Sequence, residues 1–406
     1  MRILCFIDCL GSGGAQRQLV TMASGFQQRG HEVRFLTYHP RGHFLPELEA
    51  AKISCICIPK AGYLRRMWGV RRVLRQGWQD VVLAFIEAPS LYAELAGLPS
   101  RKWGLVVGER NAHPDTGRGW RSWLRWPHRF ADAVVANSHT SRLMLERAWP
   151  ALRPKLCTIY NAVDLNRFRP PHSTGLGDSS NSPLRVVVVA SYQRLKNMMG
   201  LAQALQLLRQ SGGRSVVVDW YGAIPPDQKP LREGNAFVRR HRLESVLRFH
   251  PPIREVEAEY ERADFVGLFS EYEGLPNGVC EGMACGRPIV MSDVSDARQL
   301  VEDGKNGFLC DPHSPVSIAE ALRRMASLTT GERLQMGLES RRRAEQLFDA
   351  DIIMGRYERI LESASRRAPV PVDCSKPLEK SSFAEAAGSF LIRHPAPESL
   401  TEIVKQ

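Results

Sequence analysis

The chain has 406 residues, of which 43% are hydrophobic, and it carries a formal net charge of +12. This length exceeds the roughly 250 to 300 residues at which one hydrophobic core stops growing, so we expect two domains rather than one. The apolar content excludes a mainly disordered chain. Residues 1–165 hold 23 Lys and Arg against 12 Asp and Glu, whereas residues 166–406 hold 32 against 31. The excess of positive charge in residues 1–165 predicts that this part of the chain faces an anionic surface or partner.

The nine cysteines are odd in number, scattered, and without the paired spacing of zinc ligands. This pattern predicts a reduced, intracellular protein without a metal site. The apolar start, residues 2–8, is too short for a signal peptide, and no apolar run approaches the length of a membrane span. We therefore expect a cytoplasmic protein, either soluble or peripheral on the inner face of the membrane.

Short β-rich runs alternate with longer helical patterns, and the alternation restarts near residue 185. Such alternation predicts an α/β protein with two parallel, doubly wound sheets. The expected strands are 2–8, 32–38, 53–59, 81–86, 104–109, 133–137 and 156–160, then 185–190, 215–219, 246–249, 264–269 and 288–291. The stretch 165–184 between the sheets is rich in Pro, Gly and Ser and is typical of a linker. We expect the binding cleft between the two domains.

A glycine-rich loop at residues 11–14 follows the first predicted strand and precedes a helix predicted at 19–28. Glycines let a backbone approach a ligand closely, and the start of a helix favours a phosphate. Gly13 and Gly14 are therefore candidate phosphate-binding residues, although such loops also serve as plain strand-to-helix turns.

Two stretches of the first domain, 63–78 and 119–126, interleave Arg with Trp and Leu. This composition suits an anionic membrane surface, where basic groups meet lipid phosphates and indoles lie at headgroup depth. A solvated helix face over buried Trp side chains would have the same composition. We expect no nucleic-acid partner, because no recognition fold accompanies the basic residues.

The most informative segment is 270–288, in which Glu273 and Glu281 flank a strand-to-helix turn. Free N–H groups at the start of the helix, from Asn277 to Val279, suit a diphosphate. A carboxylate accepts hydrogen bonds, so Glu281 suits a ribose diol and Glu273 suits sugar hydroxyls. A solvated loop charge at Glu273 and a helix-dipole partner at Glu281 are the structural alternatives.

This segment, continued through 289–293 and 303–308, resembles the signature of retaining glycosyltransferases of family 4. The resemblance covers residues 1–364 and is far more specific in the C-terminal half. It implies the GT-B fold, in which two Rossmann-like domains face a cleft, and it implies a nucleotide-sugar site. The residues that it assigns to donor binding in this segment are Gly274, Leu275, Pro276, Asn277, Gly278, Val279 and Glu281. The glycine-rich loop resembles the family's N-terminal loop, which closes over the donor phosphates and borders the acceptor. This likeness makes Gly13 and Gly14 candidate donor-binding residues, whereas Arg17 fits a surface or acceptor-facing position better than a catalytic one. It implies neither a cofactor nor a bound metal.

The same resemblance assigns catalytic roles in the second domain. Lys196 matches a lysine that neutralises the donor diphosphate, and Glu273 matches the glutamate that contacts the sugar. Ser191 stands where the family has an arginine, and Arg194 on the same loop could take over that charge. The loop that ends at Ile253 corresponds to the region that reads the base, largely through backbone groups. Further departures at Ser295, Asp296 and Gln299 leave the donor's identity open.

In the first domain, many relatives carry a catalytic histidine after the fifth strand, where this chain has Glu109, Arg110 and, slightly later, His113. Some polysaccharide-building relatives share a similar Glu-Arg-Asn run. Glu109 could accept sugar hydroxyls, Arg110 could bind phosphate, and His113 could act in catalysis or simply cap a turn before Pro114.

The function implied is retaining transfer of a sugar, from a UDP-sugar in our expectation, to a saccharide or polyprenyl-linked acceptor in cell-surface polysaccharide synthesis. A front-face displacement fits best, because no carboxylate stands out as a nucleophile. A GT-B nucleotide-sugar epimerase and a catalytically silent sugar-nucleotide binder are the alternatives.

The sequence divides into a first domain (1–164), the linker (165–184), a nucleotide-sugar domain (185–350), a helix that crosses back to the first domain (351–367) and an extension (368–406). The helix has apolar residues near helical spacing. The extension contains an amphipathic pattern around residues 383–391. A docked helix, a weak membrane or partner contact, and a disordered tail all remain open for it.

Overall fold

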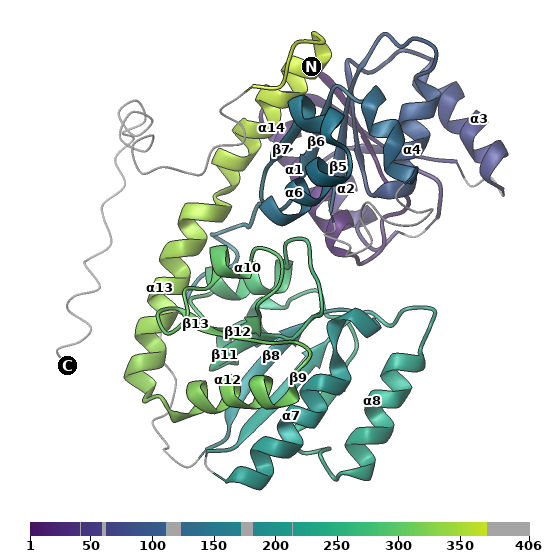
Figure 1. The fold of residues 1–406 in the computed structure, drawn as a ribbon. Coiled ribbons are helices and arrows are strands. Elements are labelled where there is room, and N and C mark those ends of the chain that lie inside the picture. The colour runs from purple at the N-terminus through teal and green to yellow at the C-terminus, as the bar shows by residue number, and fades with distance from the viewer. Residues whose placement is uncertain (41, 59–61, 111–122, 172–181, 213, 372–406) are drawn as a thin grey trace, which may run out of the picture. The chain divides into compact units, whose positions relative to one another are not determined.

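The computed structural model describes residues 1–40, 42–58, 62–110, 123–171, 182–212 and 214–371. His113, the middle of the predicted linker and nearly all of the predicted extension lie outside these residues. The described chain forms two α/β lobes, each built on its own parallel sheet (Figure 1). We call the part built on β1–β7 the first lobe and the part built on β8–β13 the second lobe.

The first lobe has seven strands, which the structure orders β3-β2-β1-β4-β5-β6-β7 in one sheet. The strands are β1 (Arg2–Phe6), β2 (Glu32–Thr37), β3 (Ser54–Cys57), β4 (Val81–Phe85), β5 (Gly104–Glu109), β6 (Ala133–Ala136) and β7 (Leu156–Thr158). The helices are α1 (Gly14–Gln28), α2 (Leu45–Ala50), α3 (Tyr63–Leu74), α4 (Glu87–Ala96) and α6 (His139–Ala148), with the short helices η1 (Trp123–Phe130) and η2 (Pro150–Lys155).

The second lobe has six strands in the order β10-β9-β8-β11-β12-β13. They are β8 (Leu184–Val189), β9 (Val216–Tyr221), β10 (Leu247–His250), β11 (Phe265–Leu268), β12 (Ile289–Ser292) and β13 (Gly307–Cys310). The helices are α7 (Met198–Ser211), α8 (Lys229–Arg240), α9 (Glu257–Arg262), α10 (Asn277–Ala284), α11 (Ala297–Leu300), α12 (Pro315–Ser327) and α13 (Thr330–Phe348), with the short η3 (Arg194–Lys196). A last helix, α14 (Ala350–Ser365), follows α13.

Both sheets are doubly wound, and every described strand pair in them is parallel. The strand order reverses beside β1 in the first lobe and beside β8 in the second. Ligands of open parallel sheets bind outside the carboxyl ends of the strands at this reversal. The predicted fold class is confirmed. Strand β13 was not predicted, because its four residues begin with Gly307 directly after a turn.

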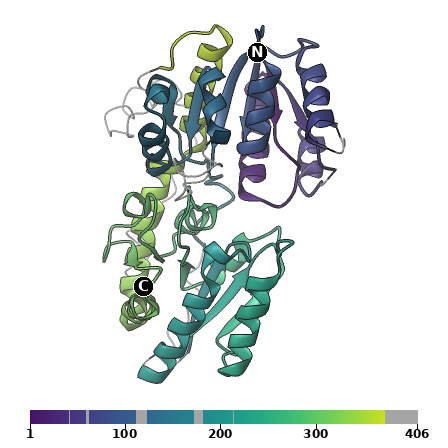
Figure 2. The same ribbon diagram turned by 45° about the vertical axis from the view of Figure 1, so that its right-hand side comes forward.

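Alternate residues of each central strand bury opposite faces, as a sheet covered by helices on both sides requires. In β1, Ile3 and Cys5 pack on the α1 side, whereas Leu4 and Phe6 pack against the side that holds α3 and α4. Helices flank both faces of each sheet (Figure 2). Helix α14 leaves the second lobe and packs on β4, β5 and α1 of the first, so the chain connects the lobes twice.

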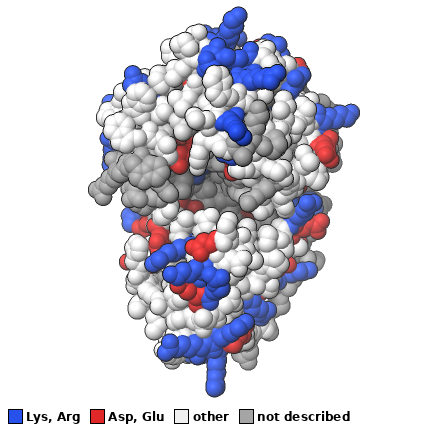
Figure 3. Space-filling view, turned by 90° about the vertical axis from the view of Figure 1, so that its right-hand side faces the viewer, with Lys and Arg blue, Asp and Glu red and all other residues white. Residues whose placement is uncertain are grey.

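Helix α3 exposes large apolar side chains on the first lobe. Tyr63 and Leu64 are each 79% exposed and Trp68 is 71% exposed. The predicted alternative of a helix face over buried Trp side chains does not hold for Trp68. Lys and Arg side chains gather on the upper part of the face in Figure 3, whereas acidic and basic side chains are interspersed on the lower part. Within the residues that the structure describes, no helix combines the length and apolarity needed to cross a bilayer.

Candidate functional site

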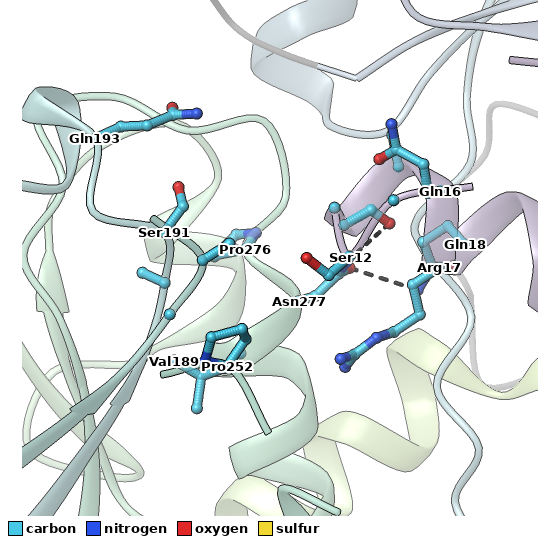
Figure 4. Close-up of a pocket in the computed structure, with 18 of the residues that line it drawn as sticks. Ser12, Gln16, Arg17, Gln18, Val189, Ser191, Gln193, Pro252, Pro276 and Asn277 are labelled. Atoms are coloured by element: carbon cyan, nitrogen blue, oxygen red, sulfur yellow. Dashed lines mark hydrogen bonds between the residues drawn. The ribbon is translucent and has the colours of Figure 1, made fainter. Parts of the chain in front are cut away.

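The carboxyl ends of the central strands of both lobes open into one cavity of about 580 Å³. This volume lies within the range of small-molecule sites. The glycine-rich loop after β1 forms one wall, and the start of α10 and the loop after β8 form the facing wall (Figure 4). The predicted site residues that line the cavity are Gly13, Gly14, Lys196, Ile253, Glu273, Leu275, Pro276, Asn277, Gly278 and Glu281.

The start of α10 is available for an anion. Its N-cap residue, Pro276, makes no side-chain capping bond, and no acidic residue lies in the first turn. The N–H of Val279 donates to the carbonyl of Pro276 at 3.1 Å. Of the three N–H groups predicted to hold a diphosphate, those of Asn277 and Gly278 therefore remain, as far as the described residues show. The helix dipole adds partial positive charge at this point.

Glycines in the site permit close backbone contacts. A Cβ atom on Gly14 would lie 2.9 Å from Nδ2 of Asn277, and the Asn277 amide itself donates to the carbonyl of Gly14 at 3.3 Å. Side chains at Gly274 and Gly278 would meet the carbonyl oxygens of Arg110 and Val189 at 2.5 and 2.7 Å. These glycines bring the start of α1 in the first lobe against the start of α10 in the second.

Glu273 and Lys196 form an ion pair in the cavity. Ser270 donates its hydroxyl to Oε1 of the same carboxylate at 2.7 Å, and Glu273 is only 8% exposed. Lys196 ends η3, directly before the left-handed residue Asn197, which caps α7. The turn thus holds the ammonium group over the cavity beside the carboxylate. Both groups remain within reach of a ligand because both line the cavity wall.

Glu281 is 3% exposed and is bonded from both lobes. Its Oε1 lies 2.7 Å from Nη1 of Arg17 on the first turn of α1, and its Oε2 accepts from the hydroxyl of Tyr260 at 3.1 Å. The Glu281 carboxylate raises the pKa of Arg17. Arg17 thus lines the cavity and pairs with the second lobe, while its acceptor-facing role stays a prediction. Figure 4 shows its side chain extending from α1 into the cavity.

Besides Glu109, three predicted residues lie apart from the cavity lining. Arg194 is exposed on η3, whereas Gly274 and Val279 are buried next to residues of the lining. Their roles, like those of the lining residues, stay predictions. Ser191, at the position where the family has arginine, does line the cavity.

Glu109 belongs to a buried charge cluster under the first lobe's helices. Its Oε2 accepts from Nε of Arg125 at 2.8 Å and lies 3.9 Å from Nε2 of His128. His128 contacts Oε1 of Glu94 through Nδ1 at 2.6 Å. Burial opposes the charge on Glu109, but His128 and Arg125 outweigh it and lower its pKa to about 2. Glu109 is not among the residues lining the cavity. Its contact with a sugar stays a prediction, and His113 lies outside the described residues.

Sequence reasoning missed the polar network that joins the lobes at the cavity wall. Arg110 donates to Asn161 at 2.9 Å and to the hydroxyl of Tyr357 at 2.8 Å. Asn161 in turn donates to Asn277 at 2.6 Å. Only the fold brings these positions together, since they are distant in the sequence. Within the described residues, no cluster of three or more His, Cys, Asp or Glu side chains could hold a metal ion.

Two doubly wound lobes around one cavity define the GT-B class of fold. Solved structures agree. Anabaena Alr3699/HepE in complex with UDP and glucose superimposes with a TM-score of 0.77 at 22% identity, covering 89% of this chain and 100% of that one. Sucrose-phosphate synthase from Thermosynechococcus elongatus gives a TM-score of 0.72 at 17% identity, covering 90% of this chain and 100% of that one. At these identities the likeness establishes the fold alone.

Two family models match in chain order. Residues 12–167 match Glycosyltransferase Family 4, and residues 183–327 match Glycosyl transferases group 1. The chain belongs to the glycosyltransferases of this group 1 and family 4 type.

Curated relatives are similar over different spans. A D-inositol 3-phosphate glycosyltransferase of Xylanimonas cellulosilytica is 30% identical over 204 residues, which is 47% of this chain and 48% of that protein. A Campylobacter jejuni transferase that adds N-acetyl-D-galactosamine to a PP-undecaprenol-linked saccharide is 24% identical over 334 residues, which is 79% of this chain and 88% of that protein. The chain spans about half the length of the first curated relatives that it matches.

Proposed function

We propose that the protein is a retaining glycosyltransferase. It transfers a sugar from a UDP-sugar to a saccharide or lipid-linked saccharide acceptor in the synthesis of a cell-surface polysaccharide. The observation that carries the proposal is the grouping of Glu273, Glu281, Lys196 and the uncapped start of α10 around one cavity. This set offers acceptors for sugar and ribose hydroxyls together with positive charge for a diphosphate.

In the proposed reaction, the diphosphate lies against the start of α10 and near Lys196. The bond between the anomeric carbon and the diphosphate oxygen breaks, and the bond to the acceptor oxygen forms on the same face of the sugar. The acceptor's proton passes to the departing diphosphate oxygen. Lys196 and the N–H groups of Asn277 and Gly278 stabilise the negative charge that develops there, and Glu273 orients the sugar through its hydroxyls.

Relatives support the donor and the acceptor class. The Anabaena protein is known in complex with UDP and glucose, and the Campylobacter relative acts on an undecaprenol-linked saccharide. An anionic membrane surface would bring such a lipid-linked acceptor to the protein. Exposed Tyr63, Leu64 and Trp68 on α3, with exposed Arg65 and Arg72 beside them, favour this association.

The first test is a thermal-shift screen against UDP, GDP, ADP and CMP, and then against the sugar nucleotides of any base that binds. A ligand at a hundred times its dissociation constant should add about 2.7 kcal/mol of stability. We expect UDP to give the largest shift in the wild type and a smaller one in Glu281→Gln. Glu302→Gln is the matched control, because Glu302 is exposed and lies away from the cavity. No shift with any nucleotide at millimolar concentration would contradict the proposal.

Product analysis separates transfer from the alternatives. Incubation with the selected sugar nucleotide and a polyprenyl-linked acceptor should give free nucleoside diphosphate and a glycosylated acceptor, and NMR should show that the anomeric configuration is retained. An epimerase would instead return a different sugar nucleotide, and a silent binder would return the donor unchanged.

Vesicle cosedimentation tests the membrane contact. Anionic vesicles should retain the wild-type protein better than neutral vesicles at low salt, and replacement of Leu64 and Trp68 by Ser should weaken that retention. Equal retention on both kinds of vesicle would contradict a role for charge.

A further inference from the structure

Arg17 lies where the two lobes meet at the cavity. It belongs to the first turn of α1, and its backbone N–H bonds the carbonyl of Gly13 at 3.0 Å. Its guanidinium crosses to the second lobe and contacts Glu281 at 2.7 Å. The arginine side chain is 29% exposed and the glutamate side chain 5% exposed. This pair therefore connects the glycine-rich loop to the carboxylate proposed for the ribose.

The pair places Arg17 in competition with a nucleotide. Tyr260 is fully buried and reaches Glu281 from the interior of the second lobe. Arg17 and Glu281 both line the cavity, so the arginine reaches the carboxylate from the side that a ligand enters. A ribose diol bound by Glu281 would approach from that same side. Arg17 must then share the carboxylate or leave it.

A released Arg17 would meet the donor's diphosphate. It lies on the same helical turn as Gly14, and Gly14 is in contact with Asn277 at the start of α10. The cavity wall carries Arg17, Lys196 and Arg110 as its Lys and Arg side chains among the described residues. Lys196 is paired with Glu273, and Arg110 is tied to Asn161 and Tyr357.

Among the residues that line the cavity, the second lobe supplies one cation, Lys196, which is less charge than the diphosphate carries. A sugar nucleotide brings two negative charges to this point, while the facing loop contributes the neutral Ser191 beside Lys196. Ion pairing with a diphosphate is stronger for a guanidinium, which donates two parallel hydrogen bonds, than for a single neutral donor. Like Lys196, Arg17 is held by an ion pair with a carboxylate of the cavity wall, so a ligand that binds Glu281 would compete with this pair.

We infer that Arg17 is a second cation for the donor's diphosphate, and that Glu281 holds it until the donor arrives and exchanges it for the ribose hydroxyls. The inference rests on the proposed function, since it requires a nucleotide-sugar donor. It assigns a specificity-determining residue to the first lobe, at the loop that borders the phosphates.

The test compares UDP with uridine, which lacks the diphosphate, by calorimetric titration of the full chain. Arg17→Gln should lower the affinity for UDP at least about tenfold, because it removes a charge-assisted contact. The affinity for uridine should stay unchanged or rise. Arg17→Lys keeps the positive charge and should lose less affinity for UDP than Arg17→Gln. Arg142→Gln is the matched control, because that arginine is 25% exposed and paired with Glu146 away from the cavity. Arg142→Gln should change the affinity for neither UDP nor uridine.

A rescue variant gives the test a second reading. Arg17→Gln combined with Ser191→Arg returns a cation to the cavity from the second lobe and should recover most of the lost UDP affinity. If Arg17→Gln lowers the affinity for UDP and for uridine equally, Arg17 has a structural role and the inference is overturned. Equal tightening of both would overturn it in favour of a residue that only blocks Glu281. If the wild type binds UDP, GDP and ADP no better than buffer, the proposed function itself fails.

Discussion

At the scale of single residues, the ion pair of Glu273 and Lys196 gives the sharpest expectation for activity. Glu273→Gln keeps the hydrogen bond from Ser270 but loses the negative charge that faces Lys196 and the sugar. We expect turnover to fall on the order of 100-fold, as for other groups that act on a developing charge. Glu271→Gln, in the same turn but outside the cavity lining, should keep most of its turnover. Comparable turnover in the two variants, with thermal denaturation showing both folded, would remove Glu273 from the mechanism.

His128 gives a prediction for stability against pH. Burial opposes its charge, but Glu94 and Glu109 outweigh burial and raise its pKa to about 9. Because this native pKa lies above the unfolded value of 6.5, protonated His128 stabilises the fold. Its contribution to the free energy of unfolding is complete below pH 6.5 and is lost as the pH rises through 9. Urea unfolding at pH 6, 7.5 and 9 measures this loss. Between pH 6 and pH 9 the free energy of unfolding of the wild type should fall by up to about 3 kcal/mol more than that of His128→Asn. Parallel losses in the two proteins would contradict this assignment.

Residues that line the cavity were predictable where the sequence holds them in one stretch. Glu273, Asn277 and Glu281 lie within nine positions of one another, and the Gly and Pro residues around them mark the turn. The partner of Glu281 was not predictable, because Arg17 is 264 positions away and only the approach of the lobes joins them. The pairing of Glu109 with Arg125, only 16 positions away, was hidden for a different reason, since nothing in a local pattern distinguishes an inward-facing arginine from a solvated one.

At the scale of elements, strands made of consecutive apolar residues were found because both faces of each central strand are buried. Short elements with weak patterns were not. Strand β13 begins at a glycine, and α1 starts five residues earlier than predicted, because Gly14 and polar residues open it. In both cases the neighbouring structure, and not the intrinsic preference of the residues, determines the element.

The docking of α14 on the first lobe depends on a glycine in β5. A Cβ atom on Gly104 would lie 2.5 Å from the backbone of Ala364 in α14. Gly104→Ala should therefore force the helix and strand apart and lower the free energy of unfolding by about 1 to 3 kcal/mol. Gly355→Ala, within α14 and with open space around it, should instead raise it by roughly 0.5 to 1 kcal/mol. Chemical denaturation measures both. Equal effects of one sign would refute the packing argument.

At the scale of the whole molecule, Asp296 explains a departure from the family that the sequence left open. The residue lies in the second lobe, before α11, yet its carboxylate bonds the first lobe. It accepts from the N–H groups of His139 and Thr140 at 2.7 and 2.9 Å, and from the hydroxyls of Thr140 and Tyr160 at 2.7 and 2.9 Å. A negative charge at the start of α6 is favourable for the helix dipole as well. Asp296 thus couples the lobes and does not line the cavity.

Asp296→Ala should loosen this coupling. Loss of buried, charge-assisted hydrogen bonds should lower the free energy of unfolding by about 2 to 4 kcal/mol. Because the bonds cap a helix of the other lobe, amide hydrogen exchange should accelerate at residues 139–141, far from the substitution in sequence. Asp293→Ala, on the same loop but paired with the exposed Arg298, should cost less than about 1 kcal/mol and leave that exchange unchanged. If exchange accelerates only within the second lobe, the carboxylate stabilises its own loop and the lobes are held together by the contacts of α14 and of Asn277.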